Sequence, residues 1–275
     1  MRIILFSLFF LCSHLVNASK IINWYVYDRP PSHFLSGPKA GQGYLDRLLA
    51  ITIKDLNEYR HITVKATIAR GLREMKQGKN ACHLSIFKTP QRELFTQFSI
   101  AHIMSPNLRV IISKKLVNEL NLPKTVSVDM LFSRYKLKAI KLPERSYTEH
   151  VDKIFSKYPE FLYNRSTLSE SGLYKMLKSG RVDFLIAVPT SANYLLDDSA
   201  SEFDSLAIEG IEKYGVAYIG CSNTAWGKKV IQKINTVLID IKSTDAYFNA
   251  MSSWLPKEEV NQEYIMYYKK HFLKN

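Results

Sequence analysis

The chain has 275 residues, 46% of them hydrophobic, which is enough for one large or two small domains with a real core. Its formal net charge of +13 favours acidic partners: nucleic acid, an anionic membrane surface or an anionic ligand. The lysines and arginines are spread along the chain without a run of five, so nucleic acid is not favoured as a partner. Ordinary surface charge and a binding function explain the positive charge equally well, and both interpretations stay open.

Residues 1–18 have the pattern of a secretory signal peptide. After a short positive start, Ile3 to Val16 is almost unbroken apolar sequence, and Val16-Asn17-Ala18 fits the small-residue cleavage pattern. The apolar run is shorter than the roughly 20 residues that span a bilayer, which favours cleavage near Ala18 over a membrane anchor. Leu11 precedes Cys12 where a lipoprotein signal needs a small residue. We therefore predict a secreted protein without a lipid anchor.

The segment that follows begins with a strand, Ile21 to Tyr27, which stops at Pro30-Pro31 because proline cannot continue a hydrogen-bonded ladder. The apolar periodicity then predicts, in chain order, a helix over 44–56, a strand over 62–68, a helix over 70–77, a strand over 81–87, a helix start at 89–93 and a strand over 108–113. The charge-rich segment after this strand indicates a boundary between lobes.

The middle and end of the chain repeat the alternation of strands and helices. The expected elements are a strand over 137–142, a helix over 147–158, a strand over 161–163, a helix over 169–178, strands over 182–188, 206–211 and 215–220, and a helix over 226–241. This order predicts an α/β architecture with mostly parallel sheets. Since no flexible Gly/Ser linker occurs, we expect short crossing strands to join the two halves.

Sequence motifs for catalysis are missing. The chain has no HExxH, GxSxG or P-loop motif, and Gly41-Gln42-Gly43 is too little for a dinucleotide fingerprint. Cys82 and His83 are neighbours in a strand and point to opposite faces, which disfavours a shared metal. Carboxylate pairs such as Glu258-Glu259 lie in polar segments. We expect a binding protein rather than an enzyme, without a metal or cofactor.

Three stretches make the α/β prediction more specific. They are Trp24 to Pro31 followed by Gly41 to Asp46, Cys82 to Ser99 with its Lys88-Thr89-Pro90-Gln91-Arg92-Glu93 core, and Gly180-Arg181-Val182-Asp183. In this order they resemble the family 3 bacterial extracellular solute-binding proteins, the amino-acid-type receptors of ABC importers. Arg145-Ser146-Tyr147 and the segment from Cys221 to Gly227 resemble an uncharacterised branch of that superfamily.

The resemblance implies a type II periplasmic-binding-protein fold, with two α/β lobes, two crossing strands and a ligand cleft between them. Lobe one is expected to comprise residues 19–110 and 216–275, and lobe two residues 111–215. Crossings are expected near 109–113 and 214–219, and the cleft closes on its ligand by a hinge motion. Ligands in open α/β sheets bind beyond the carboxyl ends of strands, here the loops after Tyr27, Phe87, Leu142 and Val188.

In the family, an arginine at this helix start grips the ligand carboxylate, and the corresponding residue is Arg92. A guanidinium makes a two-pronged hydrogen-bonded fork with a carboxylate, and the helix N-terminus adds favourable partial charge. The alternative is an ordinary surface arginine paired with Glu93 or Glu149. In the second lobe, Ser146 is expected to offer its hydroxyl to the ligand, to cap a helix with Glu149 in a capping box, or to do both.

One departure from the family concerns the ligand. Amino-acid receptors carry an acidic residue just beyond the strand that follows Gly-x-x-Asp, whereas here Asp183 leads into Phe184 to Pro189 without one. An α-amino acid is therefore doubtful, and the aromatic and basic residues of the expected cleft favour an anionic or partly aromatic solute. The expected ligand-binding residues are Tyr27, Asp28, Arg29, Phe87, Lys88, Thr89, Arg92, Arg145, Ser146, Tyr147 and Tyr194.

Two cysteines remain after signal cleavage, Cys82 and Cys221, and only one intramolecular pairing is possible. The resemblance places both strands in the same lobe, so a disulfide is expected, with a stabilisation of roughly 4 kcal/mol in the chain-entropy model.

Three functions remain open at this stage. The first is a monomeric periplasmic receptor that delivers a small solute to an inner-membrane ABC permease. The second is a soluble partner of a membrane sensor. The third is a dehydratase-like enzyme, for which Asp28 is the candidate acid or base.

Overall fold

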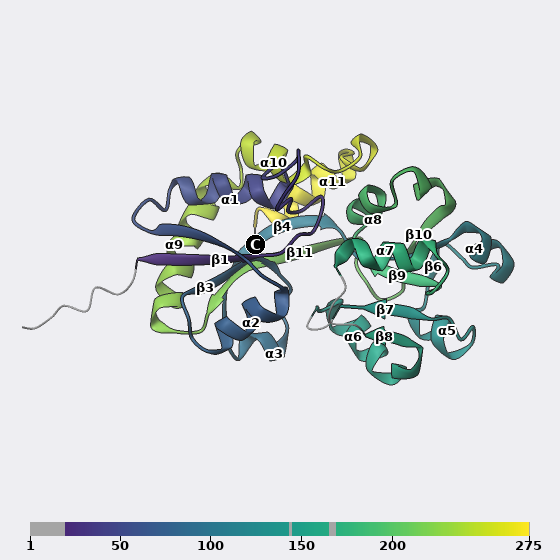
Figure 1. Cartoon of the computed structure of the whole chain (residues 1–275). Helices are drawn as coiled ribbons and strands as arrows, with labels where there is room; N and C mark the ends of the chain where they lie inside the picture. The colour runs from purple at the N-terminus through teal and green to yellow at the C-terminus, as the bar shows by residue number, and fades with distance from the viewer. Residues whose placement is uncertain (1–19, 143–144, 165–168, 275) are drawn as a thin grey trace, which may run out of the picture.

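A computed structural model describes residues 20–142, 145–164 and 169–274, and the predicted signal peptide lies outside these ranges. The described elements form two α/β lobes side by side, each built on its own sheet (Figure 1). The predicted architecture is confirmed. Among the described residues, no helix combines the length and the apolar composition needed to cross a membrane.

The first lobe is built on a sheet with the strand order β2-β1-β3-β11-β4. Its strands are β1 (Ile21–Val26), β2 (Arg60–Lys65), β3 (Ala81–Ile86), β4 (Thr96–Pro106) and β11 (Tyr214–Ser222). Its helices are α1 (Tyr44–Lys54), α2 (Ile68–Lys76), α3 (Pro90–Glu93), α9 (Ala225–Ile241), α10 (Asp245–Ser252), α11 (Gln262–Tyr267), the short η3 (Lys257–Glu259) and the π-helical η4 (Tyr268–Phe272). The lobe is thus assembled from both ends of the described chain.

The second lobe is built on a sheet with the order β6-β10-β5-β9-β7-β8. Its strands are β5 (Arg109–Ser113), β6 (Thr125–Val126), β7 (Ala139–Lys141), β8 (Leu162–Asn164), β9 (Phe184–Ala187) and β10 (Phe203–Ile208). Its helices are α4 (Lys114–Leu120), α5 (Val128–Ser133), α6 (Thr148–Lys157), α7 (Glu170–Lys178), α8 (Pro189–Leu196) and the short η1 (Pro159–Phe161) and η2 (Asp197–Glu202).

The chain passes between the sheets twice, over residues 107–108 and 209–213. Several pairs next to these passages are antiparallel: β11 pairs so with β3 and β4, and β5 with β9 and β10. The expectation of mostly parallel sheets is therefore too simple. Parallel pairing holds for β1 with β2 and β3, for β7 with β8 and β9, and for β6 with β10.

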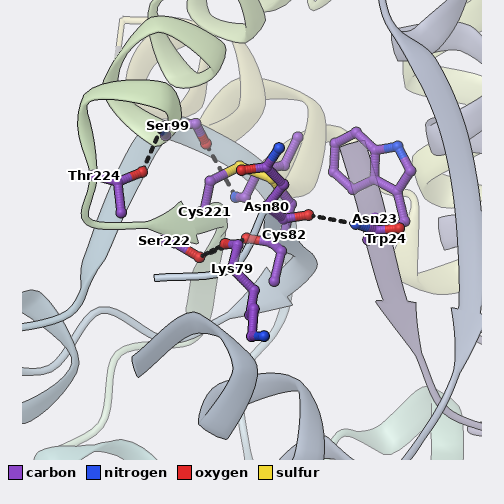
Figure 2. The surroundings of a disulfide bond; sticks show 12 residues. Asn23, Trp24, Lys79, Asn80, Cys82, Ser99, Cys221, Ser222 and Thr224 are labelled. Carbon is purple, nitrogen blue, oxygen red and sulfur yellow. Dashed lines mark hydrogen bonds between the residues drawn. A yellow bond between two sulfur atoms is a disulfide. The ribbon is translucent and has the colours of Figure 1, made fainter. Parts of the chain in front are cut away.

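A disulfide joins the central strands of the first sheet (Figure 2). Cys82 of β3 stands directly opposite Cys221 of β11 in the antiparallel register, and both are fully buried. The predicted disulfide is confirmed in the structure, where it links positions 139 residues apart in the chain. Beside it, the Ser99 hydroxyl accepts a hydrogen bond from the Ile219 amide at 3.0 Å. The cross-link therefore fixes the strand that returns from the second lobe to the centre of the first.

The core of the first lobe holds a buried histidine. His102 of β4 has no exposed surface, and the Tyr247 hydroxyl lies 2.7 Å from its Nδ1 and 2.7 Å from its carbonyl oxygen. Its Nε2 is buried without a hydrogen-bond partner in the described structure. Burial, with a smaller contribution from the charge of Lys242, lowers the pKa of His102 to about 3, so the ring is neutral at pH 7.

Because His102 is buried and neutral, we expect the folded protein to become less stable as the pH falls. Between pH 6.5 and 3 the unfolded chain protonates His102 while the folded chain does not, so the free energy of unfolding falls as the pH falls. The variant His102→Phe keeps the backbone carbonyl that accepts the hydrogen bond of the Tyr247 hydroxyl. Between pH 7 and pH 4, its free energy of unfolding should fall by about 2–3 kcal/mol less than that of the wild type. Urea unfolding at both pH values measures it, and an equal decrease in both proteins would contradict the assignment.

Candidate functional site

A small cavity lies between the two lobes, at the carboxyl ends of β1 and β3. It has a volume of about 40 Å³, room for a few water molecules or one small anionic group. Its walls come from both lobes and from the passages between them: Tyr27, Arg29, Ile68, Ser85, Ile86, Phe87, Arg92, Leu108, Arg145, Ser146, Val188 and Ala217. Three arginines in so small a space distinguish this cavity, and we call it the arginine cavity.

Arg29 enters the cavity from the loop after β1. The Arg29 carbonyl accepts hydrogen bonds from the amides of Ser32 and His33 at 2.7 and 3.0 Å, which fold the loop back on itself around the cis Pro30-Pro31 bond. Nη1 of Arg29 donates to the Tyr27 hydroxyl at 3.0 Å, and its Nε is buried without a hydrogen-bond partner. No carboxylate of the described residues forms an ion pair with this guanidinium.

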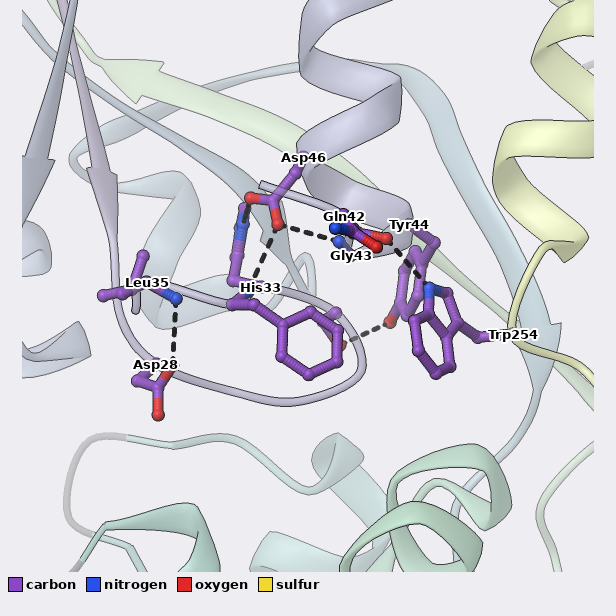
Figure 3. A network of polar contacts seen from close by, with 10 residues as sticks. Asp28, His33, Leu35, Gln42, Gly43, Tyr44, Asp46 and Trp254 are labelled. Carbon is purple, nitrogen blue, oxygen red and sulfur yellow. Dashed lines mark hydrogen bonds and ion pairs between the residues drawn. The ribbon is translucent and has the colours of Figure 1, made fainter. Parts of the chain in front are cut away.

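The same loop is anchored to α1 by a half-buried carboxylate (Figure 3). Asp46 accepts hydrogen bonds from His33 Nδ1 at 2.6 Å and from the amides of Gly43 and Phe34 at 2.9 and 3.2 Å. Burial raises the pKa of the Asp46 carboxyl, but the hydrogen bond and charge of His33 and the two amides outweigh it, and the pKa lies below its ordinary value. Asp46 therefore stays ionised and holds the loop that carries Arg29.

Arg92, for which the family resemblance predicts a contact with the ligand carboxylate, lines the cavity from α3. The Thr89 hydroxyl caps this helix by accepting a hydrogen bond from the Arg92 amide at 3.3 Å. The Arg92 side chain turns back so that Nη1 donates to the Phe87 carbonyl at 3.0 Å, and the residue is 7% exposed. It is not an ordinary surface arginine.

Arg145 enters from the second lobe and is held by a buried acid. Its Nη1 lies 2.6 Å from Oε2 of Glu170, and the two side chains are 8% and 1% exposed. Burial lowers the pKa of Arg145, but the charge of Glu170 more than offsets it, and the pKa lies well above its ordinary value. Oε1 of Glu170 is buried without a partner. Glu170 was not among the predicted site residues, although it stands just after Ser169, the N-cap of α7.

His83 lies beneath the lobe-one wall and was also missed as part of the site. It is buried in β3, and a side-chain carbon built on Gly71 of α2 would come within 2.7 Å of its Nε2, so α2 approaches closely because residue 71 is glycine. Burial, followed by the charges of Arg92, His33 and Arg29, lowers the pKa of His83 to about 3. His83 is therefore neutral and adds no charge to the cavity.

The helix-cap alternative for Ser146 is wrong. Helix α6 starts at Thr148 with Tyr147 at its N-cap position, and the Ser146 hydroxyl donates to Asp152 at 2.6 Å instead. Glu149 pairs with Lys153 at 2.7 Å. The carboxylate of Asp152, within α6, thus holds the loop before the helix. In this position Ser146 forms part of the cavity wall.

Not every predicted site residue meets in the cavity. Tyr27, Arg29, Phe87, Arg92, Arg145 and Ser146 do. Asp28 lies in a neighbouring groove, where it accepts a hydrogen bond from the Leu35 amide at 3.1 Å (Figure 3). Lys88 is exposed and pairs with Glu93 at 3.1 Å, and Thr89 acts as the helix cap described above.

Tyr147 does not line the cleft as expected. Its ring is 1% exposed in the core of the second lobe, where it packs against Phe155, because the helix start turns it inward. Its hydroxyl accepts a hydrogen bond from the Leu142 amide at 3.0 Å, and the Arg145 guanidinium lies 5.1 Å from its ring centre. Tyr147 thus supports Arg145 from behind.

Tyr194 of α8 joins the lobes in a different place. Its ring centre lies 5.4 Å from that of Phe34 and 5.6 Å from that of Trp254, both in the first lobe, and the Lys39 ammonium lies 4.9 Å from it. Trp254 in turn donates from Nε1 to the Gln42 carbonyl at 3.0 Å (Figure 3). Through Tyr194, Phe34, Trp254 and Lys39 the two lobes are in direct side-chain contact.

We expect Tyr194→Ala to open the molecule. Each aromatic pair contributes about 0.5–1.5 kcal/mol beyond its buried area, so losing both shifts the equilibrium between the lobes towards separation. Small-angle X-ray scattering of the protein without added ligand should show a larger radius of gyration. Tyr163→Ala, at a half-exposed position of the same lobe, is the control, and an unchanged radius in Tyr194→Ala would contradict the assigned role.

No family model and no curated protein sequence matches this chain. Solved structures do match. They include a histidine kinase sensor domain with similarity to periplasmic binding proteins (14% identity, 86% of this chain and 96% of that one, TM-score 0.68). An ancestral arginine-binding protein bound to arginine is 16% identical over 86% of this chain and 99% of that one, with a TM-score of 0.68.

A solute receptor for L-cysteine from Neisseria gonorrhoeae is 18% identical over 89% of this chain and 94% of that one, with a TM-score of 0.68. At these identities the similarity shows the fold, a two-lobed architecture of the periplasmic-binding-protein type, and these neighbours are ligand-binding receptors rather than enzymes.

Proposed function

We propose that this protein is a periplasmic receptor of the family 3 solute-binding type that captures a small anionic solute between its lobes for an ABC importer. The observation that carries the proposal is the convergence of Arg29, Arg92 and Arg145, from both lobes, on one small cavity. Secretion by the signal peptide over residues 1–18, the lobe boundaries at 111 and 215, and a monomeric state belong to the same proposal.

The energetics of burial favour an anion as the ligand. A guanidinium taken out of water loses its hydration, and this loss is severe unless a counter-charge and hydrogen bonds replace it. Glu170 does so for Arg145, whereas the buried Nε of Arg29 has no hydrogen-bond partner in the described structure. A carboxylate or phosphate between Arg29 and its neighbours supplies both the charge and the acceptors.

The placement of the three arginines on both lobes explains why a bound anion would close the cleft. Arg29 and Arg92 belong to the first lobe and Arg145 to the second, so one bound anion bridges the lobes. The solute then stabilises the closed state by its interactions with both sides, and an importer can recognise that state. Val188 and Pro189 occupy the place of the acid that holds the ammonium in amino-acid receptors, which argues against an α-amino acid.

A second candidate function is ligand sensing, in which the closed protein contacts a membrane receptor. It is favoured by two structural neighbours, the histidine kinase sensor domain and the BvgS VFT2 domain from Bordetella pertussis. The dehydratase alternative has less support, because Asp28 lies outside the arginine cavity. Asp28→Ala abolishing a measured turnover would revive it.

A thermal-shift screen tests the proposed function. The chain without residues 1–18 is heated in the presence of amino acids, organic acids, phosphate esters, peptides and nucleotides. A true ligand at 100 times its Kd adds about 2.7 kcal/mol to the folded state. We expect an anionic hit whose effect disappears in Arg29→Gln and persists in Arg47→Gln, an exposed control on α1. Absence of any hit, or an equal shift in Arg29→Gln, would contradict the proposal.

A further inference from the structure

The arginine cavity is too small for more than one anionic group, but it adjoins a larger groove. This groove has a volume of about 560 Å³, within the usual size of small-molecule sites. It shares Tyr27 and Ile68 with the arginine cavity, and its lining comprises Tyr27, Asp28, Leu35, Ala66, Thr67, Ile68, Ala69, Leu142, Ser169 and Glu170. Apolar side chains from both lobes form most of it, so we call it the apolar groove.

A second groove adjoins the arginine cavity on the side of Arg92 and Arg145, and its chemistry is different. It measures about 440 Å³, and its lining includes three lysines and two carboxylates, Lys76, Lys141, Lys153, Glu149 and Asp152. An apolar chain gains little there, because the groove offers charged groups that are better solvated by water. A ligand whose anionic group sits in the arginine cavity therefore has two exits, and its remaining part selects between them.

The charged residues of the apolar groove are both acidic. Asp28 is exposed, and Glu170 is buried with Oε1 unpartnered and Oε2 bound to Arg145. A second negative charge on the far end of a ligand in this groove would lie near two like charges, those of Asp28 and Glu170. Like charges about 4 Å apart repel by several kcal/mol near a protein surface. The groove thus favours an apolar body and disfavours a second anionic group.

We infer that the ligand is a monoanion with an apolar body, a monocarboxylate that carries an aliphatic or aromatic chain. Its carboxylate binds in the arginine cavity against Arg29 and Arg145. Its chain lies in the apolar groove between Ile68 and Ala69 of α2 and Leu142 of the second lobe. This inference rests on the proposed function and specifies its ligand class.

Titration calorimetry with a chain-length series tests the inference. The probes are acetate, butyrate, hexanoate and octanoate, with adipate as the dicarboxylate that matches hexanoate in length. Burial of one methylene group strengthens binding about fourfold, so the Kd should fall about tenfold or more for each two-carbon step. In the apolar groove the second carboxylate of adipate faces Asp28 and Glu170, so we expect adipate to bind at least tenfold more weakly than hexanoate. Adipate that binds as tightly as hexanoate would place its second carboxylate among the lysines of the other groove and contradict the inference.

Two variants locate the chain and the charge discrimination. Ala69→Phe fills the apolar groove and should remove the gain with chain length, so that the ratio between the Kd values of acetate and octanoate falls towards one. Ala50→Phe, at an exposed position of α1, is its matched control. Asp28→Asn keeps the acceptor for the Leu35 amide but removes a negative charge, so the ratio between hexanoate and adipate should shrink at least threefold.

The outcomes separate this inference from the proposed function. If short anions bind and lose affinity in Arg29→Gln, but the Kd does not depend on chain length or adipate equals hexanoate, the ligand-class inference is wrong and the proposed function stands. The same holds if Ala69→Phe keeps the full chain-length gain, which would place the chain elsewhere. If no anion binds, or Arg29→Gln binds as well as the wild type, the proposed function itself fails.

Discussion

Replacement of both cysteines by alanine should lower the free energy of unfolding by about 2–5 kcal/mol. Cys82 and Cys221 close a loop across 139 positions, so the cross-link removes many conformations from the unfolded chain. They also lie at the centre of the first sheet, where the two strands must stay in register for the second lobe to be attached correctly. Urea unfolding of the double variant at pH 7 measures the effect.

Reduced wild-type protein is the control for this experiment. Since the reduced protein also lacks the cross-link, it should unfold at nearly the same urea concentration as the double alanine variant. A small difference is expected because the alanines leave a small cavity. The effect should be confined to stability, because neither sulfur lines the arginine cavity. A loss below about 1 kcal/mol in both proteins would show that the disulfide does not carry this stabilisation.

Replacement of Arg29 by methionine should stabilise the ligand-free protein and abolish anion binding. Methionine keeps the apolar stem of the side chain but removes a buried charge for which the described structure provides no ion pair. Exchange of buried charged groups for apolar ones of similar volume often stabilises by 1–4 kcal/mol, and we expect about 1–3 kcal/mol here. Thermal unfolding without and with the anionic hit of the thermal-shift screen measures both effects.

Arg47→Met is the matched control, because Arg47 is exposed on α1 of the same lobe. Surface substitutions of this kind change stability by no more than about 0.5 kcal/mol, and its response to the anion should equal that of the wild type. A destabilised Arg29→Met protein that still binds the anion would mean that Arg29 has a structural role. Opposite changes in stability and binding are typical of a residue kept for its ligand.

The alternation of strands and helices could be predicted because most elements carry clear apolar periodicity. The predicted strand over 81–87 and helix over 226–241, for example, correspond to β3 and α9. The long strand β4 was missed. It buries His102, Ser99 and other polar side chains, which break the apolar pattern and find their partners only in the folded protein, such as Tyr247 for His102.

The site could be predicted only in part for a related reason. The family resemblance indicated Arg92 and the loop of Arg145, and Arg29 stands in the loop after the first predicted strand, where ligands bind in open α/β sheets. Which way a side chain points is decided by local turns, and the start of α6 sends Tyr147 into the core while Ser146 stays in the cavity wall. Glu170 was missed because its partner Arg145 is 25 residues away and meets it only when the second lobe is packed.

The central claim is that guanidinium groups of both lobes grip one anion, and a double-mutant cycle tests it most directly. Calorimetry would measure the Kd of the anion found in the thermal-shift screen for the wild type, Arg29→Lys, Arg145→Lys and the double variant. Lysine keeps the charge and a partner for Glu170 but removes the two-pronged guanidinium fork. The account predicts at least a tenfold loss in each single variant, and a combined loss smaller than the product because both groups bind the same anion. Wild-type affinity in either single variant would contradict it.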